Sequence, residues 1–234
     1  MCTVRQGLLG GLLASFSIGV GYLPVGFSFG VAAVHSGISP GIALLVSVLV
    51  YAGASQFLLI SLLASGGGIL AALPPVLVMN ARHVLYGPSL AVALPSHERS
   101  LASPLLTFGL TDEVYATASS RMEAVPLNVR EYWLLGLQLG SYASWLGGTS
   151  LGVMLVGEVE HWSTALREGV TFVLPALFLA LLLDAGIRRW SVSAGVAGAV
   201  TALSSLSLAS HHALISGMLA GSLAHFVVAR RSGS

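Results

Sequence analysis

Residues 78–87, with the sequence VMNARHVLYG, place four polar side chains inside an apolar run that extends from residue 69 to residue 94. The four are Asn80, Arg82, His83 and Tyr86. On one α-helix, Asn80 and His83 would lie within about 60° of each other and Arg82 and Tyr86 about 40° apart, so all four are predicted to share one broad side. A guanidinium at membrane depth costs at least ~2.5 kcal/mol and needs a partner or a wet cavity. The stretch is therefore either a polar patch that locks helices together or, as we favour, part of a substrate or ion pathway.

The composition indicates a polytopic helical membrane protein. Of the 234 residues, 55% are hydrophobic and only 8% are charged, whereas soluble domains have about 25% charged residues. The length fits a single membrane permease domain over residues 1–234, embedded in a lipid bilayer, with no room for a soluble domain. A net charge of +1 without a clustered basic surface argues against nucleic-acid binding. The single cysteine, Cys2, excludes an internal disulfide and a thiolate metal cluster, and no cofactor is indicated.

The apolar runs predict an all-α protein with about eight transmembrane helices, or alternatively seven. Pro24 is expected to kink or break the first span, because proline removes a backbone donor. The fourth span contains Asp112 and Glu113, which are costly in an apolar segment, so this span is expected to be a broken helix or to lie near the interface. The approximate spans are residues 7–34, 40–64, 69–94, 101–120, 131–156 and 169–184, followed by two short spans within 191–229.

The arginines predict the orientation in the cell membrane. With eight crossings and a cytoplasmic N-terminus, seven arginines fall on the cytoplasmic side and two outside, as the positive-inside rule requires. A seven-span count would place Arg230 and Arg231 outside, which is less favourable. Residues 19–24 weakly resemble residues 169–175 in a span that crosses in the opposite direction, so an inverted repeat is possible, although chance explains the match equally well.

Several further motifs in the sequence have ordinary structural explanations. Pairs such as Gly26/Gly30, Gly136/Gly140 and Gly217/Gly221 are explained by close helix packing. His211-His212 is predicted to lie in a hydrated turn rather than to bind metal. Neither a nucleophile elbow nor an HExxH, CxxC or P-loop motif occurs, so we do not expect an enzyme.

The candidate pathway combines the polar residues with small residues that permit close helix approach. Arg82 could form a structural ion pair with Asp112 or Glu113, or it could meet the carboxylate of a solute. An imidazole titrates near neutral pH, so His83 together with Asp112 or Glu113 could carry a proton. The expected pathway residues are Pro24, Gly26, Gly53, Ser55, Gln56, Asn80, Arg82, His83, Tyr86, Asp112 and Glu113.

Three motifs resemble the AzlC family in residue identity and spacing: AGASQF at residues 52–57, NARHVLYG at 80–87 and LTDE at 110–113. Residues 24–30 and 37–40 also resemble this family's first hairpin, and the likeness extends over nearly the whole chain. The resemblance implies the large subunit of a branched-chain amino acid exporter, moving valine, leucine, isoleucine and also methionine. It further implies coupling to the proton gradient and a small partner subunit of the AzlD type with roughly four spans.

The sequence thus predicts a secondary transporter in which the broken first span and residues 52–57 form part of a midplane site. Half-helix ends there could meet both charges of an amino acid zwitterion. One rival is a non-transporting membrane scaffold subunit, and a membrane enzyme is a distant third. Another small solute is also an alternative, because a hydrophobic pocket discriminates one methylene by only ~1–3 kcal/mol.

Overall fold

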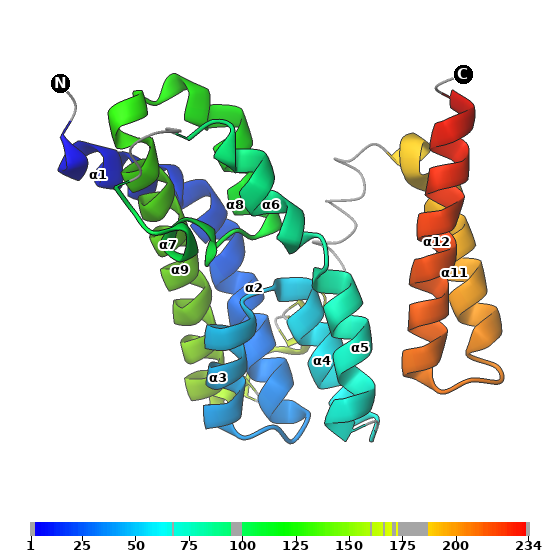
Figure 1. Ribbon diagram of the computed structural model, residues 1–234. Coiled ribbons are helices and arrows are strands. Elements are labelled where there is room, and N and C mark those ends of the chain that lie inside the picture. Colours follow the sequence, from blue (N-terminus) through cyan, green and yellow to red (C-terminus); the bar gives the residue numbers. More distant parts are fainter. Residues whose placement is uncertain are drawn as a thin grey trace. The chain divides into compact units, whose positions relative to one another are not determined.

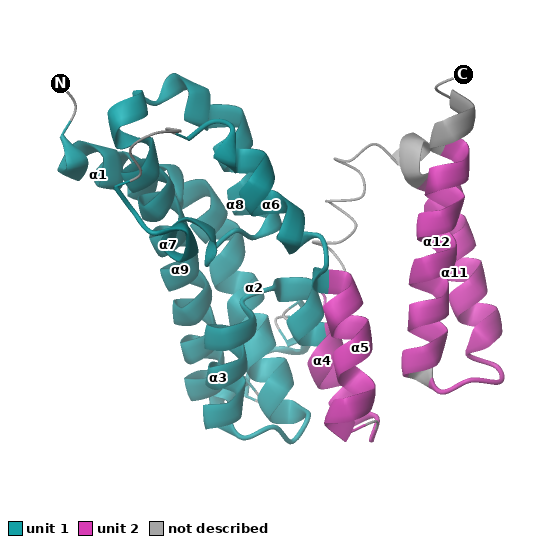
Figure 2. Ribbon diagram, viewed as in Figure 1, with its two compact units in different colours: residues 1–57, 80–171 teal, residues 58–79, 172–234 magenta. Residues whose placement is uncertain are grey.

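The computed structural model describes residues 3–66, 68–94, 100–159, 161–165, 167–169, 172 and 187–232. Within these ranges the regular structure is helical and no strand occurs, which confirms the predicted all-α class (Figure 1). The chain divides into two compact units, residues 1–57 with 80–171 and residues 58–79 with 172–234 (Figure 2). The predicted sixth span and the second copy of the repeat lie largely outside the described residues.

Three helical segments in the described part of the chain are long and apolar enough to cross a membrane: Phe16–His35, Gly68–Ala91 and His211–Val228. Shorter apolar helices cover Pro40–Val50, Gly53–Ala64 and Ser191–Ser204. The chain is thus rich in apolar helices, as predicted, while the number of crossings stays a prediction.

The first predicted span is interrupted at a different residue from the one expected. Helix α1 covers Val4–Ala14 and α2 covers Phe16–His35, so the interruption lies at Ser15. The Ser15 hydroxyl donates to the Leu12 carbonyl (2.7 Å), a back-bond that bends helices. Of the kink or break predicted at Pro24, the break is wrong, since α2 is continuous there, while the kink stays a prediction. A helix can keep a proline when neighbouring helices hold it in place, which the packing described below provides.

The second predicted span consists of two helices, α3 (Pro40–Val50) and α4 (Gly53–Ala64). Between them Tyr51 adopts a left-handed conformation with φ +38°, the only positive φ of a non-glycine residue in the described ranges. A bulky side chain rarely tolerates this conformation, which is strained and often found at functional sites. The Tyr142 hydroxyl donates to the Val48 carbonyl (2.9 Å), which satisfies one carbonyl at the end of α3. The segment predicted as the second span therefore contains an interruption that the sequence did not place.

The third predicted span is also split, into α5 (Gly68–Asn80) and α6 (His83–Ala91). Residues 81 and 82 form a turn between them. The single-helix geometry predicted for the stretch 78–87 is therefore wrong, because the turn re-aims the side chains that follow it.

The fourth span confirms the broken-helix alternative. Helix α7 (Ser103–Thr107) ends before a short irregular stretch, and α8 (Asp112–Arg121) begins after it. Thr111 caps α8 by accepting from the Val114 amide (3.4 Å). Asp112 and Glu113 occupy the first turn of α8, where the helix dipole favours negative charge. Two short 3-10 turns, η1 (Met122–Ala124) and η2 (Leu127–Val129), lead to the next helix.

Helix α9 (Arg130–Val159) is continuous and packs against α1, α2 and α3 within the first unit (Figure 1). Its glycines allow direct backbone contact. A Cβ atom on Gly136 would lie 2.2 Å from the Leu8 carbonyl oxygen, and one on Gly152 would lie 2.1 Å from that of Phe27. Helices α1, α2 and α9 therefore form a closely packed platform that leaves no space for larger residues at these contacts.

In the second unit, α11 (Ile187–Ser204) and α12 (Ser210–Ser232) pack against each other. A Cβ on Gly221 would lie 2.7 Å from Cβ of Ala197, so this contact is also close. The two helices predicted within residues 191–229 are confirmed. His211 and His212 lie in the first turn of α12 rather than in the preceding connection, which corrects that prediction.

Candidate functional site

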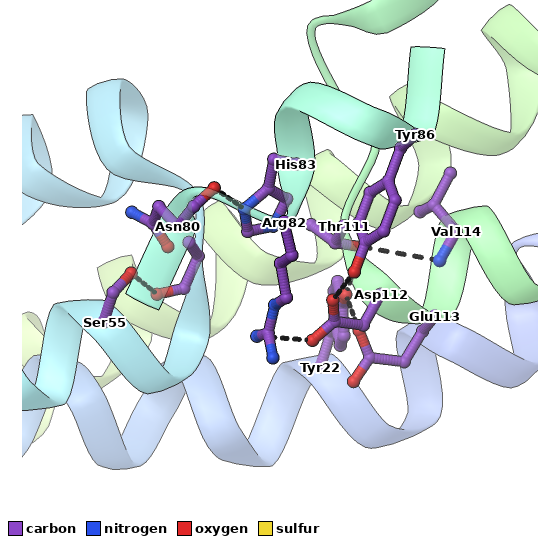
Figure 3. A network of polar contacts seen from close by, with 11 residues as sticks. Tyr22, Ser55, Asn80, Arg82, His83, Tyr86, Thr111, Asp112, Glu113 and Val114 are labelled. Carbon is purple, nitrogen blue, oxygen red and sulfur yellow. Dashed lines mark hydrogen bonds and ion pairs between the residues drawn. The ribbon is translucent and has the colours of Figure 1, made fainter. Parts of the chain in front are cut away.

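The helix interruptions bring together the charged residues predicted from the sequence. Arg82, in the turn before α6, places its Nη2 2.6 Å from Oδ2 of Asp112 at the start of α8 (Figure 3). The Tyr86 hydroxyl donates to the other carboxylate oxygen of Asp112. The Arg82 and Asp112 side chains are 47% and 36% exposed in the isolated chain. Asp112 is thus held from both sides, and the ion pair stays accessible to a small solute.

A second group of hydrogen bonds joins α2 to the start of α8. The Tyr22 hydroxyl lies 2.6 Å from Oε2 of Glu113 and 2.6 Å from the Thr111 hydroxyl oxygen (Figure 3). Tyr22 has one hydroxyl proton, and an ionised carboxylate can only accept, so Tyr22 donates to Glu113 and Thr111 donates to Tyr22. This chain fixes the first turn of α8 against a helix of the platform.

His83 is oriented by the residues on each side of the turn. Its Nδ1 lies 3.0 Å from the Asn80 carbonyl oxygen, and because a carbonyl only accepts, Nδ1 must carry the proton (Figure 3). Its ring meets that of Tyr86 edge-on at 5.2 Å, and Tyr86 stacks on Tyr115 at 4.4 Å. The ring is therefore adjacent to the residue that binds Asp112.

A fully buried polar cluster anchors the break between α3 and α4. Ser47 accepts from Nε2 of Gln56 (3.1 Å) and from the Trp145 indole (3.3 Å), and it lies 2.8 Å from the Thr149 hydroxyl. With both lone pairs of Ser47 occupied, its proton goes to Thr149. The Ser55 hydroxyl donates to the Ala52 carbonyl (2.9 Å). Gln56 and Ser55 thus hold the start of α4, as small polar residues at a helix contact are expected to do.

Three buried oxygens beside these interruptions have no hydrogen-bond partner among the described residues: the Tyr51 hydroxyl, Oε1 of Gln56 and Oδ1 of Asn80. Buried polar atoms are normally paired, and each exception in a native structure requires a reason. A ligand that donates hydrogen bonds to these oxygens would explain why they have no partner within the protein.

The other predicted residues are placed apart from the charged network. A Cβ on Gly53 would lie 3.1 Å from the Trp145 ring, so this glycine gives α4 its close approach to α9. Gly26 is buried, and a Cβ there would lie 2.6 Å from the Trp145 carbonyl oxygen, which indicates packing. The side chain of Pro24 is exposed.

Sequence reasoning did not single out Tyr22, Tyr51 or Trp145 as site residues. The three rings meet edge-on, with centroid distances of 6.3 Å between Tyr22 and Tyr51, 5.4 Å between Tyr22 and Trp145, and 6.5 Å between Tyr51 and Trp145. Aromatic residues are common in membrane helices, so only their contact with the interruptions marks them. In the described ranges no group of three or more metal-ligating side chains occurs.

The family model for the AzlC protein matches residues 17–159, which contain the entire network. The chain belongs to the AzlC family. The inner membrane protein YgaZ of Escherichia coli (strain K12) is 34% identical to it over 222 residues, which are 94% of this chain and 90% of YgaZ. An uncharacterised membrane protein of Archaeoglobus fulgidus is 40% identical over 193 residues, 82% of each chain.

The branched-chain amino acid transport protein AzlC of Bacillus subtilis (strain 168) is 27% identical to this AzlC-family chain over 167 residues. That similarity covers 70% of this chain and 62% of the relative. No solved structure matches the chain. Family membership therefore confirms the resemblance noted in the sequence. The roles of individual residues are proposed below.

Proposed function

We propose that this AzlC-family protein is a secondary transporter that exports branched-chain amino acids, namely valine, leucine and isoleucine, and also methionine. The observation that carries the proposal is the Arg82–Asp112 ion pair at the junction of two interrupted helices. Discontinuous helices with ionisable residues are typical of transporter binding sites. The name of the Bacillus subtilis relative supports the substrate class.

In this mechanism Arg82 binds the substrate carboxylate. Without substrate, the Asp112 carboxylate pairs with the Arg82 guanidinium. The substrate carboxylate and the Asp112 carboxylate would therefore compete for the same cation. Protonation of Asp112 would remove its negative charge and release Arg82 for the substrate. Substrate binding and protonation of Asp112 would therefore favour each other, which is a physical basis for coupling transport to protons.

His83 would pass protons to this site. Its ring adjoins that of Tyr86, which donates to Asp112. An imidazole can lose and regain a proton near neutral pH, whereas a tyrosine hydroxyl can relay one through its hydrogen bond. Gln56, Ser55 and Gly53 would shape the adjoining start of α4.

We also propose that the whole chain acts as one permease domain with eight crossings of the cell membrane and cytoplasmic termini. It would work with a small membrane subunit of the AzlD type and would catalyse no chemical reaction. The rival proposal, a scaffold subunit that moves no solute, would use the same polar residues for assembly alone.

Counterflow of labelled valine in liposomes tests the proposal, with the protein alone and together with the small subunit. We expect Arg82→Ala to abolish counterflow while the protein still inserts. Arg121→Ala is the matched control, because Arg121 is exposed at the end of α8, and its counterflow should equal that of the wild type. Undiminished counterflow in Arg82→Ala would remove Arg82 from the mechanism. Correctly inserted wild-type protein that moves no valine in either setting would favour a scaffold or another solute.

A further inference from the structure

We infer that Glu113, together with the hydroxyl groups of Tyr22 and Tyr51, forms the subsite for the α-ammonium group of the substrate. The inference rests on the proposed function, because it assigns the second charged group of the same zwitterion. Arg82 would bind the substrate carboxylate in competition with Asp112, and Glu113 would bind the substrate ammonium group.

The charges around the interruptions do not balance in the absence of a ligand. Arg82 is paired with Asp112 at 2.6 Å. Glu113 accepts from the Tyr22 hydroxyl, and no arginine or histidine forms an ion pair with it in the described part of the chain. An ionised carboxylate in a membrane bundle is costly without a cation. The site thus has one negative charge to offer to a positively charged ligand group.

The unpaired oxygens indicate which kind of cation would fit. The Tyr51 hydroxyl and Oε1 of Gln56 belong to the interruption between α3 and α4, and Oδ1 of Asn80 ends α5. The two amide oxygens can only accept hydrogen bonds, and the tyrosine hydroxyl can also accept. An alkylammonium group carries three N–H donors and no acceptor, so it complements oxygens of this kind.

Contacts between rings place Tyr51 beside the Glu113 network. Tyr51 is 7% exposed and meets the Tyr22 ring edge-on at 6.3 Å, while the Tyr22 hydroxyl contacts Glu113 at 2.6 Å. Tyr51 also packs edge-on against Tyr142 at 4.8 Å. These contacts hold Tyr51 in its strained backbone conformation, with a buried hydroxyl that lacks a partner among the described residues. Strain of this kind is maintained where a side chain must be held in place for function.

The test compares two competitors of valine counterflow that differ only at the amine. The first is unlabelled valine, and the second is 3-methyl-2-oxobutanoate, which has the same side chain and carboxylate but a ketone in place of the ammonium. The measured quantity is the ratio of their half-inhibiting concentrations. All variants are assayed with the small subunit present if the wild type requires it.

We expect the wild type to be inhibited at a lower concentration of valine than of the oxo acid. In Glu113→Gln the ratio of the two half-inhibiting concentrations should fall about tenfold, which is the usual contribution of a hydrogen bond to a charged group. The half-inhibiting concentration of the oxo acid should stay unchanged. Tyr51→Phe, which removes only the hydroxyl, should reduce the preference by about threefold. If Glu113→Gln fails to insert, Tyr51→Phe alone decides the test. A wild type without preference, or variants that keep it, would overturn the inference.

Failure of the proposed function would give a different result. If the wild type moves no valine, binding of isobutylammonium to the purified protein is measured instead. Binding that Glu113→Gln weakens about tenfold would support the ammonium subsite even though valine is not the substrate. Equal binding to the wild type and the variant, or no binding to either, would overturn it.

Discussion

Gln138 replaces the hydrogen bonds that the chain loses between α7 and α8, so its substitution should weaken the fold at the site. The side chain is fully buried in the middle of α9. Its Oε1 accepts from the Gly109 amide at 2.8 Å, and its Nε2 donates to the Leu106 carbonyl at 3.3 Å. Asp112 begins α8 three residues after Gly109, so Gln138 supports the position of that carboxylate.

The substitution Gln138→Leu keeps the volume of the side chain and removes its polar atoms. The Gly109 amide and the Leu106 carbonyl would then lose this partner in a buried environment. Each unsatisfied buried group costs about 1–3 kcal/mol, and the longer bond to Leu106 should contribute toward the low end. We therefore expect a loss of about 2–4 kcal/mol in the free energy of unfolding. For a protein of this size that corresponds to a decrease in melting temperature of about 4–16 °C.

Thermal unfolding of the detergent-purified protein, followed by the loss of its monodisperse peak, measures this effect. Ser141→Ala is the matched control, because Ser141 is also fully buried in α9 but its hydroxyl donates only to the Leu137 carbonyl of the same helix (2.9 Å). The control should change the melting temperature by no more than about 2 °C. If Gln138→Leu changed it no more than Ser141→Ala does, the view that this side chain stabilises the interruption would be refuted.

Three further predictions test the platform, the network and the topology. Gly152→Leu should prevent folded protein from accumulating, because even a Cβ there would lie 2.1 Å from a backbone oxygen of α2. Gly147→Leu, where no atom lies within 4 Å, should express normally, and the fluorescence of a fused reporter protein measures both variants. Tyr22→Phe removes two hydrogen bonds of 2.6 Å and should lower valine counterflow at least about tenfold, and a wild-type rate would argue against a role for this network. In a variant without the native cysteine, a cysteine replacing Arg121 should be labelled only from the cytoplasm and one replacing Arg167 only from outside, and the reverse pattern would contradict the proposed orientation.

An ion pair between Arg82 and either Asp112 or Glu113 could be predicted from the sequence, because a charged residue in an apolar run requires an opposite charge. Glu113 was an equal candidate, and local sequence could not decide between adjacent carboxylates. The structure separates them through the start of α8, where one side chain meets Arg82 and the other meets Tyr22. The broken fourth span was predictable for a related reason, since two carboxylates fit the exposed first turn of a helix better than its middle.

The interruption at Tyr51 had no local signal. Residues 47–52 contain neither glycine nor proline, and their hydropathy is that of an ordinary transmembrane helix. The left-handed residue is held by tertiary contacts, namely the rings of Tyr22, Tyr142 and Trp145, and by the bond from Tyr142 to the Val48 carbonyl. Those partners are distant in sequence, so no reading of the segment alone could have identified them.

The positions of the prolines also show that local sequence does not determine where the helices are interrupted. Pro24, Pro74, Pro75 and Pro88 all lie inside helices, whereas none of the interruptions within residues 3–121 contains a proline. A proline removes one donor, yet α2 stays helical through Pro24, where its glycines pack directly against α9. An interruption exposes several backbone groups at once and persists only where side chains such as Gln138 supply replacements. The interruptions at Tyr51 and between α7 and α8 therefore lie where polar side chains of α9, Tyr142 and Gln138, supply hydrogen bonds to the backbone.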